Sequence, residues 1–545
     1  MSDQTSGNAA TDVDVVVVGA GFAGLCLLHK LRGLGLTARV FEAGDGVGGT
    51  WYWNRYPGAR VDIESQEYSY SFSDELQDEW RWTERYAAQP ELLAYLNHVA
   101  DRFALRDWIQ LQTRVTAAVY DEAAARWRVS TDRGDAVSAR FCVMATGCLS
   151  SPNEPDFPGL ESFRGATYHT GKWPHEGVDF TGQRVGVIGT GSSAIQSMPQ
   201  IATQAAQLYA FQRTPNYSVP AHNGPIDPAV VADWKANRTE YRAAERASGV
   251  GTLAIEATER LALEHSPEER RRIYEEKWAR GGFAIGGAFA DTGVDLTANA
   301  TVAEFAASKI REIVKDPKVA DLLTPKDYPF GTKRLCVDTG YYEIFNRDNV
   351  ALVDVSSAPI EEITPTGLRT SAGDFALDSI VFAIGFDAMT GALGKIDIRG
   401  RGGEVLKAKW ADGPRTYLGL MSAGFPNLFL VTGPGSPSVL SNMVVSIEQH
   451  VDWIAACIDH LVARQLSSIE ATVEAEDAWV AHVNEVADAT LYPLAKSWYL
   501  GANVPGKPRV FMPYVGGVGP YRDMCDAIVA NGYEGFALAS AAGGA

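Results

Sequence analysis

Two glycine-rich stretches have the residue types and the spacing that hold the diphosphate of a dinucleotide. Residues 19–24 (GAGFAG) fit the pattern G-x-G-x-x-G, and residues 189–194 (GTGSSA) fit it with alanine in the third position. The first glycine allows a tight turn, the second lets a diphosphate approach the backbone, and the third small residue lets a helix pack closely on a strand. A diphosphate in either turn would face the positive end of a helix. The sequence therefore predicts two dinucleotide sites.

The residue that ends the following strand indicates which dinucleotide each turn binds. In the first unit this residue is Glu42, whose carboxylate would bond a ribose hydroxyl and repel a 2′-phosphate. The first site is therefore predicted to bind FAD or NAD. In the second unit the corresponding residue is Gln212, followed by Arg213 and Thr214. A missing acid beside a cation and a hydroxyl favours the 2′-phosphate of NADPH, although a surface arginine is the alternative for Arg213 taken alone.

An FAD site beside an NADPH site predicts hydride transfer to a flavin, which then passes electrons to a further acceptor. The six cysteines are scattered and include no Cys-x-x-Cys pair. A disulfide reductase, a zinc site and an iron–sulfur cluster are therefore all disfavoured. We expect six reduced, buried thiols and no bound metal, and either oxygen or an external carrier as the acceptor.

The composition argues against several other classes of protein. Lys and Arg number 48 against 67 Asp and Glu, a net charge of −19 over 545 residues, which disfavours binding to nucleic acid. No apolar run approaches the roughly 20 residues that cross a bilayer. The first twelve residues lack the basic and apolar regions of an export signal, so we expect a loose tail and, by default, a cytoplasmic location. The last seven residues, ASAAGGA, are expected to be disordered.

Local patterns supply the elements that must position the two turns. An apolar run at residues 13–18, a helical pattern after the glycine turn and a strand ending at Glu42 form one strand–helix–strand unit. Residues 184–214 repeat this arrangement. Alternating polar and apolar residues predict a β-meander over residues 111–147.

Residues 226–325 change to a helical pattern. Residues 266–269 (SPEE) form a capping box with proline at the first helical position, and Thr301 with Glu304 is predicted to begin another helix in the same way. Two Gly-Gly pairs between these segments break the helical pattern, which predicts a mobile loop over a site.

The predicted fold is α/β, with two Rossmann-like dinucleotide-binding domains and an inserted helical subdomain. The FAD domain is expected to be discontinuous and to comprise residues 1–147 and 386–545. The NADPH domain is expected to comprise residues 148–225 and 326–385, and the helical insertion within it residues 226–325. The proline-rich segment SSPNEPDFPGL supports the first boundary.

Two longer strings resemble the signatures of one enzyme family. Between the glycine turns, FRGATYHTGKWP fits F-x-G-x-x-x-H-x-x-x-W-P, and residues 48–65 (GGTWYWNRYPGARVDIES) fit a second signature. Both strings resemble the Baeyer–Villiger monooxygenases, and the similarity extends over residues 13–538. Segments such as YPFGTKR and GPGSPS are most similar to the branch of phenylacetone and steroid monooxygenases. The resemblance implies that reduced FAD and O₂ form a C4a-peroxyflavin, which converts a ketone to an ester or lactone.

The resemblance also implies roles for single residues. Arg334, in the string GTKRL, matches the arginine that keeps the peroxide unprotonated and stabilises the oxyanion, and Asp62 matches the carboxylate that orients it. An ordinary salt bridge between domains is the alternative for this pair. Lys333 matches a lysine that contacts the NADP 2′-phosphate. His169, in the first string, is interpreted as coupling domain position to turnover rather than as an acid or base.

The expected site residues fall into four sets. Those expected to contact FAD are Gly19, Gly21, Phe22, Ala23, Gly24, Glu42, Gly49, Thr50, Trp51, Asp62, Tyr68, Val115 and Met443. Those expected to contact NADP are Arg60, Gly189, Thr190, Gly191, Ser192, Ser193, Ala194, Gln196, Arg213, Thr214, Lys333, Arg334 and Trp498. Those expected to line the ketone site are Val439, Leu440 and Met443. The expected hinge residues of the first string are Phe163, Gly165, His169, Trp173 and Pro174.

The leading hypothesis is an FAD- and NADPH-dependent Baeyer–Villiger monooxygenase that acts on aryl, cyclic or steroid-like ketones with O₂. An N- or S-oxygenating flavin monooxygenase is the alternative enzyme, since it attacks soft nucleophiles instead of carbonyls. A non-enzymatic NADPH sensor is the alternative from another class, because a fold alone does not fix a function. We expect a small-molecule substrate and no required protein partner, nucleic acid or membrane.

Overall fold

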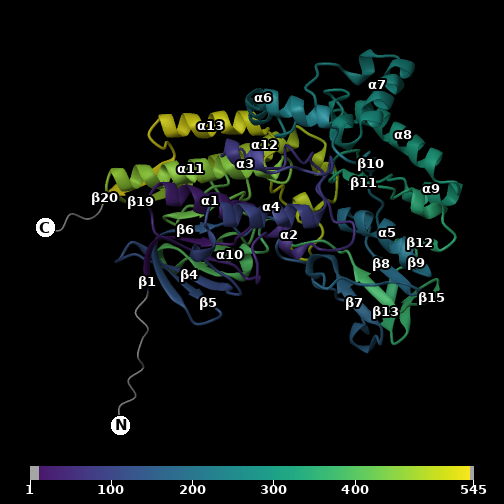
Figure 1. Cartoon of the computed structure of the whole chain (residues 1–545), viewed down its shortest axis with the longest axis horizontal. Helices are drawn as coiled ribbons and strands as arrows, with labels where there is room; N and C mark the ends of the chain where they lie inside the picture. Colours follow the sequence, from purple (N-terminus) through teal and green to yellow (C-terminus); the bar gives the residue numbers. More distant parts are fainter. Residues whose placement is uncertain (1–10, 541–545) are drawn as a thin grey trace, which may run out of the picture.

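The computed structural model describes residues 11–540, and its two largest β-sheets lie below the long helices in Figure 1, the first at the left and the second at the right. The first sheet has the strand order β17-β4-β5-β6-β1-β2-β3, with β18 paired to β6. Its strands are β1 (Thr11–Val18), β2 (Ala38–Phe41), β3 (Ile109–Gln110), β4 (Val115–Asp121), β5 (Arg126–Thr131), β6 (Ala136–Met144), β17 (Asp397–Arg399) and β18 (Leu428–Leu430). Strand β1 runs parallel to β2 and β6, while β4, β5 and β6 form the predicted meander. The first glycine turn and the meander therefore belong to one sheet.

The second sheet is parallel throughout, in the order β12-β9-β8-β16-β7. Its strands are β7 (Ala166–His169), β8 (Arg184–Ile188), β9 (Gln207–Gln212), β12 (Val350–Asp354) and β16 (Ser379–Phe382). Helix α5 (Ser192–Gln204) connects β8 to β9 after the second glycine turn. Smaller sheets are the pair β10 (Ser218–Pro220) and β11 (Cys336–Asp338), and the meander of β13 (Ile360–Thr364), β14 (Gly367–Thr370) and β15 (Gly373–Ala376). The predicted α/β fold with two Rossmann-like units is confirmed.

Helices from the N-terminal and C-terminal parts of the chain pack together over the first sheet. Helix α1 (Phe22–Gly33) follows the first glycine turn and packs against α11 (Met443–Ala463). The other elements of this part are α2 (Thr50–Trp53), α3 (Asp74–Glu79), α4 (Gln89–Arg102), α10 (Leu406–Lys409), α12 (Val473–Asp488), α13 (Val518–Ala530), β19 (Leu466–Ala471) and β20 (Phe536–Ser540). The strands of each large sheet come from the ranges expected for one domain, and the exact domain boundaries stay a prediction.

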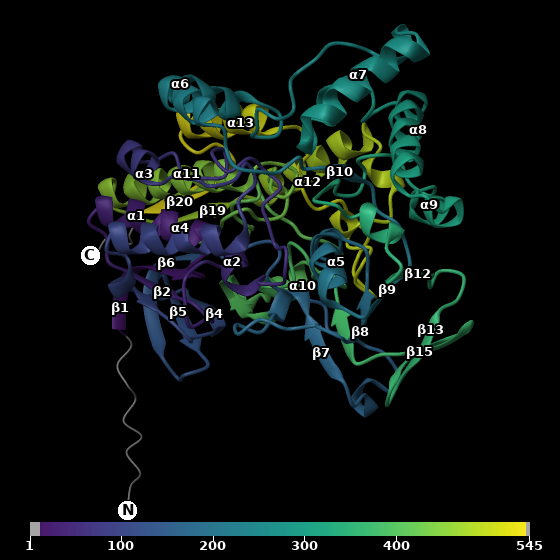
Figure 2. The same ribbon diagram turned by 45° about the vertical axis from the view of Figure 1, so that its right-hand side comes forward.

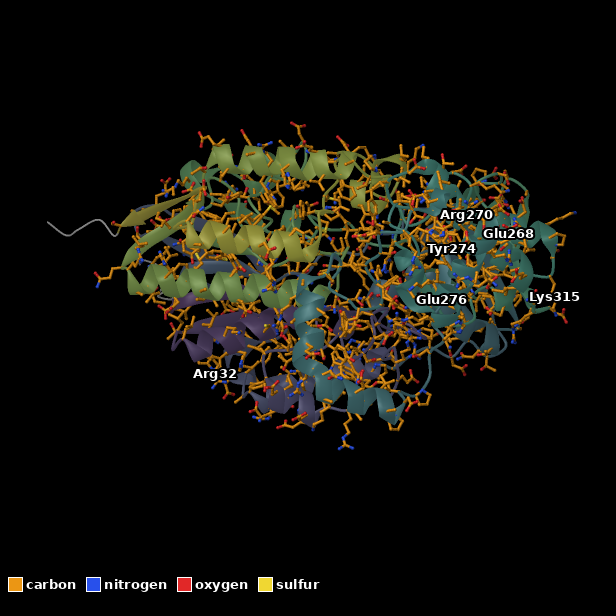
Figure 3. The ribbon with its side chains drawn as sticks, turned by 90° about the horizontal axis from the view of Figure 1, so that it is seen from above. Arg32, Glu268, Arg270, Tyr274, Glu276 and Lys315 are labelled. Atoms are coloured by element: carbon orange, nitrogen blue, oxygen red, sulfur yellow. The ribbon has the colours of Figure 1, made fainter. Side chains whose placement is uncertain are left out.

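The helical insertion extends away from both sheets, and its first helix lies along α13 (Figure 2). Its elements are α6 (Pro228–Ala247), α7 (Pro267–Arg280), the 3₁₀ helix η5 (Gly282–Gly287), α8 (Leu296–Ile313) and α9 (Pro317–Leu323). Seen from above, the labelled α7 residues Glu268, Arg270, Tyr274 and Glu276 lie at the opposite end of the molecule from Arg32 of α1 (Figure 3). The predicted capping box at Ser266 is confirmed, since its side chain and that of Glu269 bond each other's backbone N–H.

The second predicted capping box is wrong. Helix α8 begins at Leu296, because the Asp295 carboxylate accepts a hydrogen bond from the Ala298 N–H (2.8 Å) and caps the helix earlier. Thr301 lies inside the helix, where its hydroxyl donates to the Ala298 carbonyl (2.7 Å). Threonine at this depth in a helix bonds the preceding turn instead of capping a new one.

The two chain ends are also more regular than expected. Thr11 and Asp12 belong to β1 and pair with β6, and Ala539 and Ser540 belong to β20 and pair with β19. The tail predictions are therefore wrong at these four residues, because backbone hydrogen bonds to a neighbouring strand hold them. The rest of both predicted tails, residues 1–10 and 541–545, lies outside the part of the chain that the structure describes. All six cysteines are free and buried, as predicted.

Candidate active site

A large cavity of about 1220 Å³ lies where the two glycine turns and the helical insertion meet. Its wall includes the first glycine turn, the start of α5, the loop before α11 and the segment around Trp498. The carboxyl ends of parallel strands converge at this kind of crevice in α/β proteins. The cavity is therefore the candidate active site.

The first glycine turn is shaped by close backbone contacts. Gly19 has φ +107°, and a Cβ there would lie 2.5 Å from the Ala145 carbonyl oxygen. A Cβ on Gly24 would overlap the Gly19 carbonyl oxygen, so helix α1 can approach the turn only with glycine at this position. A Cβ on Gly21 would lie 3.2 Å from the Cα of Gly49, on the side of the turn that faces the cavity. These contacts leave a backbone cradle of the kind that a dinucleotide diphosphate requires.

Glu42 is fixed beside this cradle. Its carboxylate accepts hydrogen bonds from the backbone N–H groups of Ala20 and Gly44, both at 2.8 Å. The side chain is buried at the end of β2 and belongs to the cavity wall. Two backbone donors therefore hold this acid in place, and its remaining lone pairs can accept from a ribose hydroxyl.

The second glycine turn repeats the first only in part. Gly189 has φ +112°, and a Cβ there would overlap the Ala383 carbonyl oxygen. The Thr190 hydroxyl donates to the Thr214 carbonyl (2.7 Å), which ties the turn to the segment after β9. Gly191 belongs to the cavity wall, and a Cβ there would have nothing within 4 Å. This turn is therefore more open than the first.

The residues expected to select NADPH lie just outside the cavity wall. Gln212 is buried, and its amide donates to the Leu322 carbonyl (2.7 Å), so it faces α9. Arg213 is exposed beside it. Burial lowers the pKa of Lys333, and the nearby charge of Arg213 lowers it further. Arg213 and Lys333 therefore form a cationic pair that would attract a phosphate.

Arg334 and Asp62 form an ion pair in the cavity wall, although 272 positions separate them in the chain. The Arg334 Nε and Nη2 groups both donate to Asp62 Oδ2, the first at 3.2 Å. Asp62 comes from the loop between α2 and α3, and Arg334 from the segment before β11. The carboxylate raises the pKa of Arg334 above its ordinary value, more than burial lowers it. A permanent, oriented cation therefore lies at the cavity.

Comparisons with known proteins cover nearly the whole chain. A family model described as pyridine nucleotide-disulphide oxidoreductase matches residues 16–250, the part that contains both glycine turns. A Baeyer–Villiger monooxygenase of Pseudooceanicola batsensis is 46% identical over 96% of this chain and 95% of its own length. The chain belongs to the Baeyer–Villiger monooxygenase family.

Two further relatives agree with this assignment. An acetone monooxygenase (methyl acetate-forming) of a Gordonia species is 44% identical over 97% of this chain and all of its own. A structure of oxidized steroid monooxygenase bound to NADP is 57% identical, with a TM-score of 0.94 over 97% of this chain and all of the other. The absence of Cys-x-x-Cys separates this family member from the disulfide reductases that share the two-turn plan.

The cavity brings together most of the residues expected from the sequence of this Baeyer–Villiger monooxygenase. Those in the cavity wall are Gly19, Gly21, Phe22, Ala23, Glu42, Gly49, Thr50, Trp51, Arg60, Asp62, Tyr68, Val115, Gly191, Ser192, Ser193, Gln196, Arg334, Val439, Leu440, Met443 and Trp498. Those outside it are Gly24, Gly189, Thr190, Ala194, Arg213, Thr214, Lys333 and the five hinge residues. The expected contacts of both groups with FAD, NADP or a ketone stay predictions.

The string that contains the expected hinge residues runs along β7, at the edge of the second sheet, and reaches the cavity wall only at residues 171–172. A Cβ on Gly165 would overlap the Asp378 carbonyl oxygen, so this glycine allows the chain to pass close to β16. His169 Nδ1 accepts from the Gly171 N–H (3.0 Å), and burial lowers the pKa of the imidazole. Trp173 is buried in the core of the second unit. The five expected hinge residues therefore lie outside the cavity wall, and their role in coupling domain position to turnover stays a prediction.

The helical insertion supplies a cavity wall that sequence patterns identified only as a loop over a site. Phe283 and Ile285 of η5, Phe289 after it, and Ile255 of the segment after α6 all contribute. The Gly-Gly pairs at the two ends of η5 were the available signal. These apolar side chains could not be assigned to a site from spacing, because they follow no motif.

Two negative findings concern residues 11–540. No group of three or more His, Cys, Asp or Glu side chains in this range is arranged to hold a metal ion. Within the same range, every helix is too short or too polar to cross a membrane.

Proposed function

We propose that this chain is an FAD- and NADPH-dependent Baeyer–Villiger monooxygenase that converts a ketone and O₂ into an ester or lactone. The observation that carries the proposal is the ion pair of Arg334 and Asp62 in the cavity wall. Family membership supports the reaction class, and the similar steroid monooxygenase structure is described as bound to NADP. Aryl, cyclic or steroid-like ketones are the proposed substrates, and no second protein is proposed to take part.

The two glycine turns are proposed to hold the two dinucleotides. When bound, FAD supplies the chemistry with O₂ and NADPH supplies the hydride. The cradle around Gly19 and Gly21 fits a diphosphate because a Cβ on Gly21 would narrow it on the cavity side, and Glu42 is fixed beside it for a ribose hydroxyl. Arg213 and Lys333 would supply the two cations for the 2′-phosphate.

Arg334 is proposed as the catalytic residue. When an oxygen nucleophile adds to a ketone, negative charge develops on the carbonyl oxygen, and oriented N–H donors stabilise that charge. A guanidinium keeps its positive charge throughout, and Asp62 raises the pKa of Arg334 further. Asp62 binds Nε and Nη2, and Nη1 makes no hydrogen bond to any residue in the described part of the chain. Nη1 is therefore the donor proposed to meet the substrate oxygen.

The ketone is proposed to lie between the loop before α11 and the helical insertion. Val439 has φ +63°, an unfavourable conformation for a β-branched residue, and its N–H points to Met443 Sδ (3.2 Å). Strained backbone of this kind is concentrated at functional sites. Phe283 and Phe289 face the same cavity from the insertion. This apolar enclosure suits a hydrophobic ketone and limits access of water.

The test is ester formation from a simple aryl ketone. Purified FAD-loaded protein is mixed with NADPH, air and phenylacetone, and benzyl acetate is measured by gas chromatography. We expect ester from the wild type and a loss of roughly 10²–10³-fold or more in Arg334→Ala, because the oriented donor is removed. Arg334→Lys is the matched control, since it keeps the charge but not the two-point contact with Asp62.

The possible results separate the reaction classes. Equal ester formation by wild type and Arg334→Ala would contradict the role of Arg334. NADPH consumption with peroxide but no ester from several ketones would contradict ketone oxygenation, and amines and sulfides would then be tried as substrates for N- or S-oxygenation. No NADPH oxidation in air would favour a sensor.

A further inference from the structure

Helix α5 bonds the loop that carries Asp62. Gln196, one turn into α5, accepts a hydrogen bond from the Tyr56 hydroxyl through Oε1 (2.8 Å). Its Nε2 donates to the backbone carbonyl of Arg60 (3.0 Å), two residues before Asp62. One side-chain amide of the second unit is therefore bonded at both ends to a loop of the first unit.

The packing around this amide leaves little freedom. The Gln196 backbone carbonyl lies so close to Gly58, which has φ +81°, that a Cβ on Gly58 would overlap it. The Tyr56 ring packs against the hydrophobic core of the second unit, which includes Ile195 of α5. Residues 56–60 are therefore held by α5 through two hydrogen bonds and close packing, and a shift of α5 must displace this loop.

The partner of Asp62 is connected to the same helix. Cys336 follows Arg334 by two residues, and its thiol lies 3.3 Å from the hydroxyl of Ser192, the first residue of α5. The Cys336 thiol also approaches the Arg334 carbonyl (3.7 Å). Both members of the ion pair are thus linked to the first turn and a half of α5, and this part of α5 follows directly on the second glycine turn.

We infer that Gln196 is a positioning residue that couples the second glycine turn to the Arg334–Asp62 pair, so that a nucleotide on the turn sets the place of Asp62. This inference rests on the proposed function, in which NADP occupies the second turn. In this assignment the amide of Gln196 binds Tyr56 and the Arg60 carbonyl, whereas the sequence predicts that the residue contacts NADP directly. If the amide only joined the two units, binding of the nucleotide at the second turn would not change the position of the loop that carries Asp62.

Hydrogen exchange of the FAD-loaded protein, with and without NADP⁺, tests the coupling directly. In the wild type we expect NADP⁺ to slow exchange both in peptides over residues 189–196 and in peptides over residues 56–64. The second set includes the Val61 N–H, which donates to the Ala87 carbonyl (3.1 Å). In Gln196→Leu we expect the protection at 189–196 to persist and the protection at 56–64 to be lost.

Turnover provides a second readout. In Gln196→Leu we expect the ester formed per NADPH consumed to fall at least fivefold and the peroxide released to rise, while the NADP⁺ Kd changes less than threefold. Tyr56→Phe, which removes one of the two bonds, should give a smaller loss in the same direction and guards against a folding defect in the leucine variant. Tyr274→Phe is the matched control, since that hydroxyl bonds Thr301 (2.7 Å) within the insertion and neither residue belongs to the cavity wall.

The outcomes distinguish this inference from the proposed function. If NADP⁺ protects residues 189–196 but not 56–64 in the wild type, the coupling is wrong while the nucleotide site stands. If both regions stay protected in Gln196→Leu and in Tyr56→Phe, the inference is also overturned. If NADP⁺ protects neither region in the wild type, the proposed NADP site itself fails.

Discussion

The two glycine turns share a backbone plan but differ in their surroundings. Gly19 and Gly189 have nearly the same positive φ, and each lies against the carbonyl of a residue just after a neighbouring strand. Around the first turn, α1 is buried over most of its length and packs against α11. Around the second, α5 buries one face, and its first residues, Ser192 and Ser193, border the cavity.

This difference shows how one motif can serve two purposes. Behind the first turn the packing is tight, with Gly24 pressed against the Gly19 carbonyl, and such packing suits a group that stays bound through many turnovers. The second turn has Ala194 in the third position and an open Gly191, which suits a nucleotide that enters through the cavity. The motif defines a diphosphate cradle, and the packing behind it determines how tightly the ligand is enclosed.

The largest expected effect would come from exchanging the third residues of the two motifs. Gly24→Ala places a Cβ on top of the Gly19 carbonyl oxygen, so α1 must move away from the turn. We expect the purified variant to retain almost no FAD, measured as flavin absorbance per protein. Ala194→Gly should cost only about 1–2 kcal/mol of stability, from helix propensity and the loss of one buried methyl group, and should leave the flavin content unchanged.

Gly33→Ala is the matched control for the first exchange. Gly33 is the last residue of α1, and a Cβ there would have nothing within 4 Å. It should retain FAD like the wild type. Full flavin content in Gly24→Ala would show that the first turn is as tolerant as the second, and the contrast between the two enclosures would be lost.

The next effect concerns the choice of nucleotide at the second turn. Arg213→Ala removes an exposed cation, and a charge-assisted hydrogen bond to phosphate is worth about 1.5–3 kcal/mol, so kcat/KM for NADPH should fall roughly 10–100-fold. The value for NADH, which lacks the 2′-phosphate, should change little and serves as the internal control. Steady-state rates with both nucleotides give the answer, and an equal loss for both would exclude recognition of the 2′-phosphate by Arg213.

Regular elements with strong local signals could be predicted from the sequence. The glycine turns, the meander and the Ser266 capping box each depend on short-range geometry, and the structure has all of them. The prediction of a second capping box was wrong because Asp295, six residues earlier, caps the helix in place of Thr301. The prediction of loose chain ends was wrong at the residues named above because pairing with a distant strand, as between Ser540 and Leu466, leaves no local pattern.

The candidate site was predictable where motifs mark it. Arg334 and Asp62 could be paired only through the family resemblance, since a separation of 272 positions carries no spacing signal. Phe283 and Phe289 of the cavity wall have no motif and became visible only in three dimensions. The bonds of Gln196 to Tyr56 and to the Arg60 carbonyl likewise depend on how the two units pack against each other.

The smallest expected effect concerns two carboxyl groups, one beside each unit, that respond to pH in opposite ways. Burial and the nearby Glu245 raise the pKa of Glu67 to about 8, whereas hydrogen bonds from Arg184 lower the pKa of the half-exposed Asp378 to about 2. In the folded protein Glu67 stays protonated at pH values above 4.5, its ordinary pKa. This group therefore makes the protein less stable as pH rises from 4.5 to about 8. Asp378 adds stability at neutral pH that is lost as pH falls from 3.8 toward 2.

Glu67→Gln isolates the buried group near the first unit. The amide keeps an acceptor for the Thr252 hydroxyl and the Leu253 N–H but cannot ionise. We therefore expect the Tm of the FAD-loaded variant to exceed that of the wild type by a few degrees near pH 9 and to match it near pH 5, by calorimetry. Asp378→Asn should leave the alkaline side unchanged. Parallel pH profiles for Glu67→Gln and wild type would mean that Glu67 is already ionised at neutral pH, and the contrast between an enclosed first unit and an open second unit would then not extend to their carboxyl groups.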